Sequence, residues 1–171
     1  GIALLNDCKY GHDCLDDRVS LTLLKSAKAP DPESDQGTHY FTYALLPHTG
    51  DFTVERVVRP AYEVNMPIHA VPAGKNTGGL TIDPSRLCVV SSPHVVVEAV
   101  KKAEEGHALI FRLYEAGHRQ GMVQIAFLRP VRKVEECNLM EESEAVLPVL
   151  DNAVTLTVTP FAIRTLKVWF R

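Results

Sequence analysis

The sequence predicts an all-β fold: an antiparallel β-sandwich (supersandwich-like) with a minor helical insertion near residues 51–65. Short apolar or alternating segments recur along the chain, turn residues separate them, and helical periodicity is rare. The length of 171 residues suits one domain with its own hydrophobic core. A hydrophobic content of 46% and a charged content of 23% are ordinary for a globular protein. We therefore expect a single domain over residues 1–171.

Residues 40–46 carry the strongest strand signal. Both alternating sets of side chains in this stretch are apolar, aromatic or β-branched, so either face of a strand could be buried. A strand that is buried on both faces normally lies deep in a sheet. Pro47 cannot donate to a ladder and should end the strand. We expect this stretch to form the central strand of the domain.

Shorter patterns predict the other strands in chain order. Residues 6–17 should form a polar loop, and Asp16 and Asp17 at its end should form the turn of a hairpin. In residues 95–105 helix propensity competes with a strand, but the β-branched run 95–97 favours a hairpin into the next strand. Residues 131–137 lead away from the strand at 122–127, and residues 163–170 close the domain. The predicted strands are 2–5, 18–24, 85–91, 94–101, 108–115, 122–127 and 154–158.

Two segments depart from the strand pattern. Apolar residues between 54 and 62 recur at the spacing of one helix face, but Pro60 interrupts a continuous helix. Two short helical turns, the second starting at Pro60, satisfy both signals. Residues 25–38 contain two prolines and a glycine and form a connection whose length is often functional.

Composition excludes several classes of partner. A formal net charge of −3 gives no basic field, so we expect no nucleic acid and no anionic membrane as partner. No apolar run approaches the roughly 20 residues that span a bilayer. Four cysteines occur without C-x-x-C spacing, and the start lacks a signal-peptide pattern, so we expect reduced thiols and a cytoplasmic location. Gly1 in place of a methionine suggests a piece of a longer enzyme.

Several motifs resemble one known family. The Asp-Gln-Gly of residues 35–37, His39, and the Phe-Thr-Tyr-Ala-Leu followed by Pro-His within residues 41–48 resemble a signature of the family 38 glycoside hydrolases. More narrowly, they are similar to the cytosolic α-mannosidase branch. Three further segments match that branch in the same order. The resemblance implies the carboxy-terminal β-domain of such an enzyme. The further matching segments are 6–11, 61–65 and 112–116.

The resemblance implies one function for the whole enzyme and a smaller one for this chain. Family 38 enzymes hydrolyse terminal α-D-mannosides with retention of configuration, through an aspartate nucleophile and a divalent metal, usually zinc. Those residues belong to the amino-terminal catalytic barrel, so we expect no catalytic residue, metal ligand or cofactor in residues 1–171. The expected partners are that barrel and a mannose-containing oligosaccharide. A domain cut from the barrel should expose an apolar patch, through which a homo-oligomer could form.

Two groups of residues are candidates for contact with substrate. Asp7, Lys9 and Tyr10 place a carboxylate, an ammonium group and an aromatic hydroxyl on one loop, and these groups suit a sugar. The alternative is that Asp7 caps a turn, Lys9 is solvated and Tyr10 packs on the sandwich. Asp35 and His39 either complete the rim of the cleft or hold the long loop onto the strand that follows.

Other polar residues predict no catalysis. His12 and Asp13 are neighbours that would point to opposite faces of a strand, so a metal site there is disfavoured. Trp169 is expected in the core or at an interdomain contact. The leading hypothesis is a bracing β-domain, and the alternative is a stand-alone mannose-binding or glycan-binding module. The acidic pairs, which we expect on a solvated surface, are 16–17, 104–105, 135–136 and 141–142.

Overall fold

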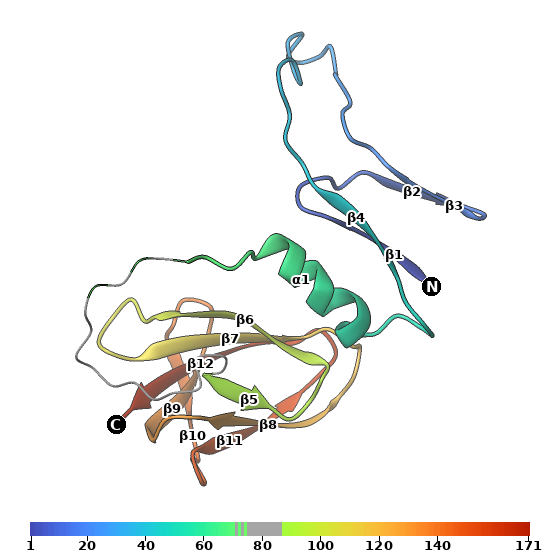
Figure 1. Ribbon diagram of the computed structural model, residues 1–171. Helices are drawn as coiled ribbons and strands as arrows, with labels where there is room; N and C mark the ends of the chain where they lie inside the picture. Colours follow the sequence, from blue (N-terminus) through green and yellow to red (C-terminus); the bar gives the residue numbers. More distant parts are fainter. Residues whose placement is uncertain (71, 73, 75–86) are drawn as a thin grey trace. The chain divides into compact units, whose positions relative to one another are not determined.

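The computed structural model describes the whole chain except residues 71, 73 and 75–86 (Figure 1). The chain divides into an amino-terminal unit, Gly1–Val71, and a carboxy-terminal unit, Pro72–Arg171. Every strand pair in both units is antiparallel. The predicted all-β class is therefore confirmed, whereas a single domain over the whole length stays a prediction.

The carboxy-terminal unit is a sandwich of two antiparallel sheets. One sheet has five strands in the order β10-β9-β12-β7-β6, and the other has three in the order β11-β8-β5. Both can be followed in Figure 1. The strands are β5 (Cys88–Val90), β6 (Val95–Lys102), β7 (Leu109–Glu115), β8 (Gly121–Phe127), β9 (Val131–Cys137), β10 (Ser143–Leu147), β11 (Ala153–Val158) and β12 (Ile163–Phe170).

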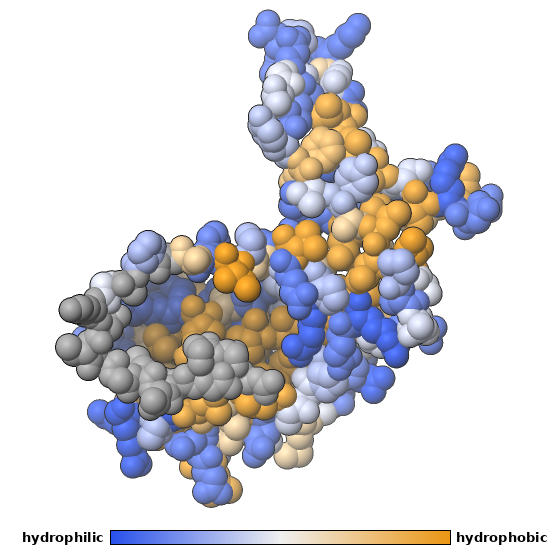
Figure 2. All heavy atoms as spheres, in the orientation of Figure 1, coloured by the Kyte–Doolittle hydropathy of each residue, from blue (hydrophilic) through white to orange (hydrophobic). Residues whose placement is uncertain are grey.

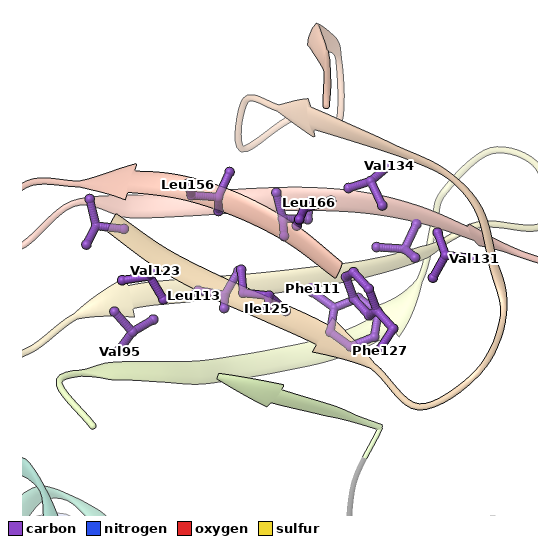
Figure 3. Packing of buried hydrophobic residues seen from close by; sticks show 13 residues of the cluster. Val95, Phe111, Leu113, Val123, Ile125, Phe127, Val131, Val134, Leu156 and Leu166 are labelled. Atoms are coloured by element: carbon purple, nitrogen blue, oxygen red, sulfur yellow. The ribbon is translucent and has the colours of Figure 1, made fainter. Parts of the chain in front are cut away.

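The hydrophobic core lies between these two sheets (Figure 3). Because side chains alternate along a strand, every second residue of β7 and β12 points inward. Phe111 of β7 is fully buried and meets Phe127 of β8 edge to face, with ring centroids 5.3 Å apart. The other buried members of the cluster are Val95, Leu113, Val123, Ile125, Val131, Val134, Val154, Leu156, Val158, Leu166 and Val168.

Most predicted strands of this unit are confirmed. β6 and β7 form the expected hairpin, with Val95 opposite Glu115 and Lys102 opposite Leu109, so the strand interpretation was right against the helical one. The start of the predicted strand 85–91 lies outside the described residues. β10 was not predicted, because its residues are exposed except at Leu147 and show no apolar alternation. Its pairing with β9 makes it a strand.

The amino-terminal unit consists of two small strand pairs and a short helical segment. β1 (Ile2–Asn6) pairs with β4 (Tyr43–Pro47), and β2 (His12–Leu15) pairs with β3 (Arg18–Leu21). The predicted turn at residues 16–17 joins β2 to β3, and Asp16 there has a positive φ of 52°. β2 lies within the loop that was predicted for residues 6–17, and β3 ends three residues earlier than expected.

The prediction of a central strand at residues 40–46 was wrong. β4 begins only at Tyr43, and among the described residues it pairs with β1 alone. Tyr43 and Leu45 are 55% and 64% exposed, so one of its two apolar faces has no cover here. The pattern correctly reports two apolar faces, but burial depends on neighbouring layers, which the pattern does not contain. Pro47 does end the strand, as predicted.

The helical insertion is confirmed. A π-helical turn, η1 (Val54–Val58), runs directly into α1 (Arg59–Asn65), with Pro60 in the first turn of the helix, where a missing N–H costs nothing. Thr53 caps η1 by accepting a hydrogen bond from the Arg56 amide. No helix among the described residues is long and apolar enough to cross a membrane.

Candidate functional site

Asp7 joins the end of β1 to the start of β4. Its Oδ2 accepts a hydrogen bond of 2.8 Å from the Thr42 amide, and its own amide donates to the Thr42 carbonyl at 3.2 Å. Hydrogen bonding from the Cys8 thiol, and then from the Thr42 amide, lowers the pKa of Asp7 below its ordinary 3.8. Asp7 thus holds the β1–β4 pair together.

Lys9 lies over an aromatic ring. Its Nζ is 4.7 Å from the centroid of Phe41, which is a cation–π distance, and its amide donates to Asn6 Oδ1 at 2.8 Å. Both Lys9 and Phe41 are half-buried. The Lys9 ammonium group is therefore held over the Phe41 ring and is not fully solvated.

Asp35 closes the long connection between β3 and β4. Its Oδ2 accepts hydrogen bonds from the amides of Ser26, at 2.8 Å, and Lys25, at 3.2 Å. His39 Nε2 donates to the Asp35 carbonyl oxygen at 2.9 Å. The pKa of Asp35 is lowered by the Ser26 and Lys25 amides, and then by electrostatic interaction with His39 and Lys9.

The structure thus gathers a loop cluster, which we define as Lys9, Asp35, His39 and Phe41. Lys9 and His39 both interact electrostatically with the Asp35 carboxylate, and the Lys9 ammonium group lies over the Phe41 ring. Tyr10 is not part of it: its side chain is 86% exposed, and its carbonyl oxygen is hydrogen-bonded to His12 Nδ1 at 3.0 Å. Phe41 was not among the predicted site residues, although it stands in the same motif as His39.

An apolar groove runs along the strands of the amino-terminal unit. Its volume is about 320 Å³, and every side chain that lines it is apolar or aromatic. Figure 2 shows apolar residues gathered on the surface of these strands. By contrast, the buried hydrophobic residues among the described part of this unit are Leu5 and Val54. The groove is lined by Ile2, Ala3, Leu4, Val19, Leu21, Leu23, Tyr43 and Leu45.

The described residues hold no group of three or more His, Cys, Asp or Glu side chains that could bind a metal ion. His12 contacts the Tyr10 carbonyl oxygen, and Asp13 lies 3.6 Å from the guanidinium of Arg18. All four cysteines, each within the described residues, are free thiols. The zinc that the family resemblance implies therefore finds no fitting donor set here, and we derive no chemical step through it.

Three members of the acidic pairs, Glu135, Glu136 and Glu141, are not on the solvated surface that was predicted, whereas Glu142 is exposed. Glu141 is only 9% exposed, and its carboxylate contacts Lys101 Nζ at 2.8 Å and accepts from the Glu104 amide at 2.9 Å. Glu135 and Glu136 are also mostly covered, and they form ion pairs with a lysine and an arginine of their own sheet. The fold brings Lys101 beside Glu141 and Arg164 beside Glu136, and these distant partners are not apparent from neighbours in the sequence.

Trp169 packs against a small hydrophobic cluster of its own unit, which is the first of the two expected environments. It is half-buried and packs against the small cluster of Ala103, Ala108 and Ile110. Lys133 Nζ lies 4.9 Å from its ring centroid. An interdomain role for Trp169 stays a prediction.

Glu115 is the most buried charged residue of the described part of the chain, and it was not predicted to matter. It is 1% exposed, and its carboxylate accepts hydrogen bonds from the amides of Gly117 (2.8 Å), Arg119 (3.1 Å) and Phe161 (3.1 Å). Burial raises the pKa of Glu115, but the hydrogen bonds from Phe161, Arg119 and Gly117 outweigh burial and lower the pKa below its ordinary 4.5. One ionised side chain therefore ties together turns 46 residues apart.

Two family models match this chain, and both describe carboxy-terminal domains of one enzyme family. Residues 1–33 match the glycosyl hydrolases family 38 C-terminal domain. Residues 94–166 match the glycosyl hydrolases family 38 C-terminal beta sandwich domain, which covers most of the strands of the observed sandwich. The chain therefore belongs to glycosyl hydrolase family 38, as a part of its carboxy-terminal region.

Its relatives carry the names of α-mannosidases. The chain is 40% identical to Alpha-mannosidase 2C1 of Mus musculus, and 40% identical to Alpha-mannosidase 2C1 of Homo sapiens, over 171 residues in each case. It is 31% identical to Alpha-mannosidase G of Dictyostelium discoideum over 172 residues. These alignments cover 97%, 97% and 98% of this chain, but only 16% of each relative. The chain thus spans about a sixth of the length of the relatives that it matches.

Proposed function

We propose that this chain is the non-catalytic carboxy-terminal β region of a longer, cytoplasmic α-mannosidase. In this proposal the whole enzyme hydrolyses terminal α-D-mannosides with retention of configuration. The nucleophile and a divalent metal, usually zinc, belong to an amino-terminal catalytic barrel outside this chain. The role of this chain is to brace that barrel and to line part of the substrate cleft.

The observation that carries the bracing role is the apolar groove of the amino-terminal unit. A monomer rarely leaves such a surface open, because each fully buried leucine-sized side chain stabilises by about 1.5–3 kcal/mol. The relatives extend far beyond this chain, so the longer polypeptide contains enough residues to cover the groove. The occupant that we propose is the barrel of the same polypeptide.

The loop cluster supports the second part of the proposal. A sugar is bound by a few placed polar groups together with an aromatic face. Lys9, Asp35 and His39 supply such groups, and Phe41 supplies the ring. Asp7 links β1 to the residues before β4 through its hydrogen bond with Thr42, whereas the Tyr10 side chain is exposed to solvent. Free thiols at Cys8 and Cys14, both exposed, fit the reducing cytoplasm.

Two experiments test the proposal. The chain alone, with an aryl α-mannoside and added zinc, should show no turnover, and clear turnover would refute a non-catalytic role. Next, Leu45→Asp in the groove is compared with Leu150→Asp, a control that is 75% exposed and lies outside the groove.

In the isolated chain neither substitution should change the melting temperature much, because both side chains are exposed. In the longer polypeptide only Leu45→Asp should lower the melting temperature and the activity, since it buries a charge against the barrel. Equal effects of the two substitutions in the longer polypeptide would overturn the bracing role.

A further inference from the structure

Two turns at one end of the sandwich present a pair of stacked rings. His118 follows β7 and Phe161 precedes β12, two neighbouring strands in which Tyr114 lies opposite Ile163. The ring centroids of His118 and Phe161 are 5.1 Å apart and their planes differ by 9°. His118 is exposed, and Phe161 is 64% exposed. In this stack each ring covers one face of the other, so the aromatic surface that the pair can offer to solvent is the outer face of each ring.

Both residues hold a backbone conformation that is costly for them. His118 has a φ of 56° and Phe161 a φ of 60°. The Ala162 amide donates to the Thr159 carbonyl oxygen at 3.1 Å, and Pro160 occupies the second position of this turn. These are the features of a type II turn, whose third position normally takes glycine. A phenylalanine there costs of order 1–3 kcal/mol, and such strain is characteristic of functional sites.

The surrounding structure is built to hold the rings in place. The Glu115 carboxylate accepts from the Gly117 and Arg119 amides on either side of His118, and from the Phe161 amide itself. Glu115 and Ala162 also share a backbone hydrogen bond of 3.0 Å. One buried anion therefore fixes both turns, and a fixed aromatic surface loses little entropy when it binds a ligand.

A small pocket with a mixed polar and apolar lining begins beside this surface. It has a volume of about 110 Å³ and is lined in part by Ser92, His94, Arg119 and Gln120, of which Arg119 directly follows His118. His94 Nδ1 is buried and has no hydrogen-bond partner among the described residues. The pocket holds only about three or four water-sized volumes of roughly 30 Å³ each, so it admits hydroxyl or hydroxymethyl groups and not a whole sugar ring.

We propose that Phe161, backed by His118, forms a platform on whose outer face a pyranose ring stacks, with its hydroxyl groups directed into the pocket. The C–H face of a pyranose is apolar and packs on the negative face of an aromatic ring, while its hydroxyl groups need donors and acceptors nearby. The platform and the pocket supply these two requirements side by side. The choice of a mannoside as ligand rests on the proposed function, whereas the platform itself does not.

The test is a titration of the ¹⁵N-labelled chain with methyl α-D-mannopyranoside, followed by NMR. Saturable shifts are expected at the amides of residues 115–121, 159 and 161–163. Phe161→Gly should keep the melting temperature, because glycine relieves the strained φ while the ring stacking is lost. The same variant should bind about tenfold more weakly or worse. Phe52→Ala is the matched control, because Phe52 is 62% exposed and lies in the other unit.

The outcomes separate this inference from the proposed function. Unchanged affinity of Phe161→Gly, or shifts confined to the loop cluster around Lys9 and Asp35, would overturn the platform. Shifts at the platform would support it even if the longer polypeptide proved inactive on mannosides. Equal affinity for methyl β-D-glucopyranoside would overturn the choice of mannose as the ligand.

Discussion

Replacing Glu115 by glutamine removes a charge and one acceptor while keeping the shape of the side chain. The carbonyl oxygen of the new amide can still accept from Gly117 and Arg119, but its NH₂ group would face the Phe161 amide, which then loses its acceptor. Hydrogen bonds to a charged acceptor are about twice as strong as neutral ones. A lost bond that leaves a covered donor unpaired costs about 1–3 kcal/mol.

Together these terms predict that Glu115→Gln lowers the free energy of unfolding by about 2–4 kcal/mol. For a unit of this size the melting temperature should fall by at least about 8 °C. Thermal denaturation followed by circular dichroism measures this change. Glu144→Gln is the control: Glu144 is exposed, and its substitution should change stability by no more than about 0.5 kcal/mol.

The pH dependence provides a second readout. The folded chain holds the pKa of Glu115 below 4.5, so on acidification the unfolded chain binds the proton first. The stability that Glu115 contributes is therefore fully present above its unfolded pKa and is lost as the pH falls through its folded pKa. Glu115→Gln should lack this loss. Parallel pH profiles for the wild type and the variant, with equal melting temperatures, would refute the reasoning.

Two further predictions concern single contacts. Gly117→Ala should destabilise the chain by about 1–3 kcal/mol in thermal denaturation, because a Cβ there would lie 2.5 Å from His94 Nδ1. His94→Gly in the same chain removes the ring and also the His94 Cβ, which would lie 2.9 Å from the new Cβ, so it should restore part of that loss; no restoration would contradict the contact. Asp7→Asn should speed iodoacetamide labelling of Cys8 near neutral pH, because Asp7 raises the pKa of that thiol. Labelling that is unchanged or slower would argue against this; mass spectrometry identifies the labelled cysteine.

The sequence predicted local pairing better than layering. The hairpin of β6 and β7 was predictable because β-branched residues and a turn at its tip are local signals. The position of β4 in its sheet was not predictable, because an apolar face can be covered by residues outside this chain as well as by residues within it. β10 was missed because its exposed residues carry no apolar pattern, and only its pairing with β9 makes it a strand.

The candidate sites were predictable to a similar degree. Asp35 and His39 were named together, and the structure joins them through a hydrogen bond. Glu115 gave no signal, because its burial depends on the Phe161 turn, which is distant in the sequence. The same holds for His118 and Phe161, whose stacking requires β7 and β12 to be neighbours. Contacts across a sheet are therefore the part that a single sequence conceals.

The β1–β4 ribbon has a consequence for handling this protein in solution. Among the described residues each of its strands has only the other as a partner, so each leaves a row of backbone N–H and C=O groups open along one edge. Apolar side chains flank these edges, which is the combination that lets strands of neighbouring molecules add to one another. Aggregation of concentrated preparations should therefore begin in the amino-terminal unit, while the sandwich stays folded inside the aggregate.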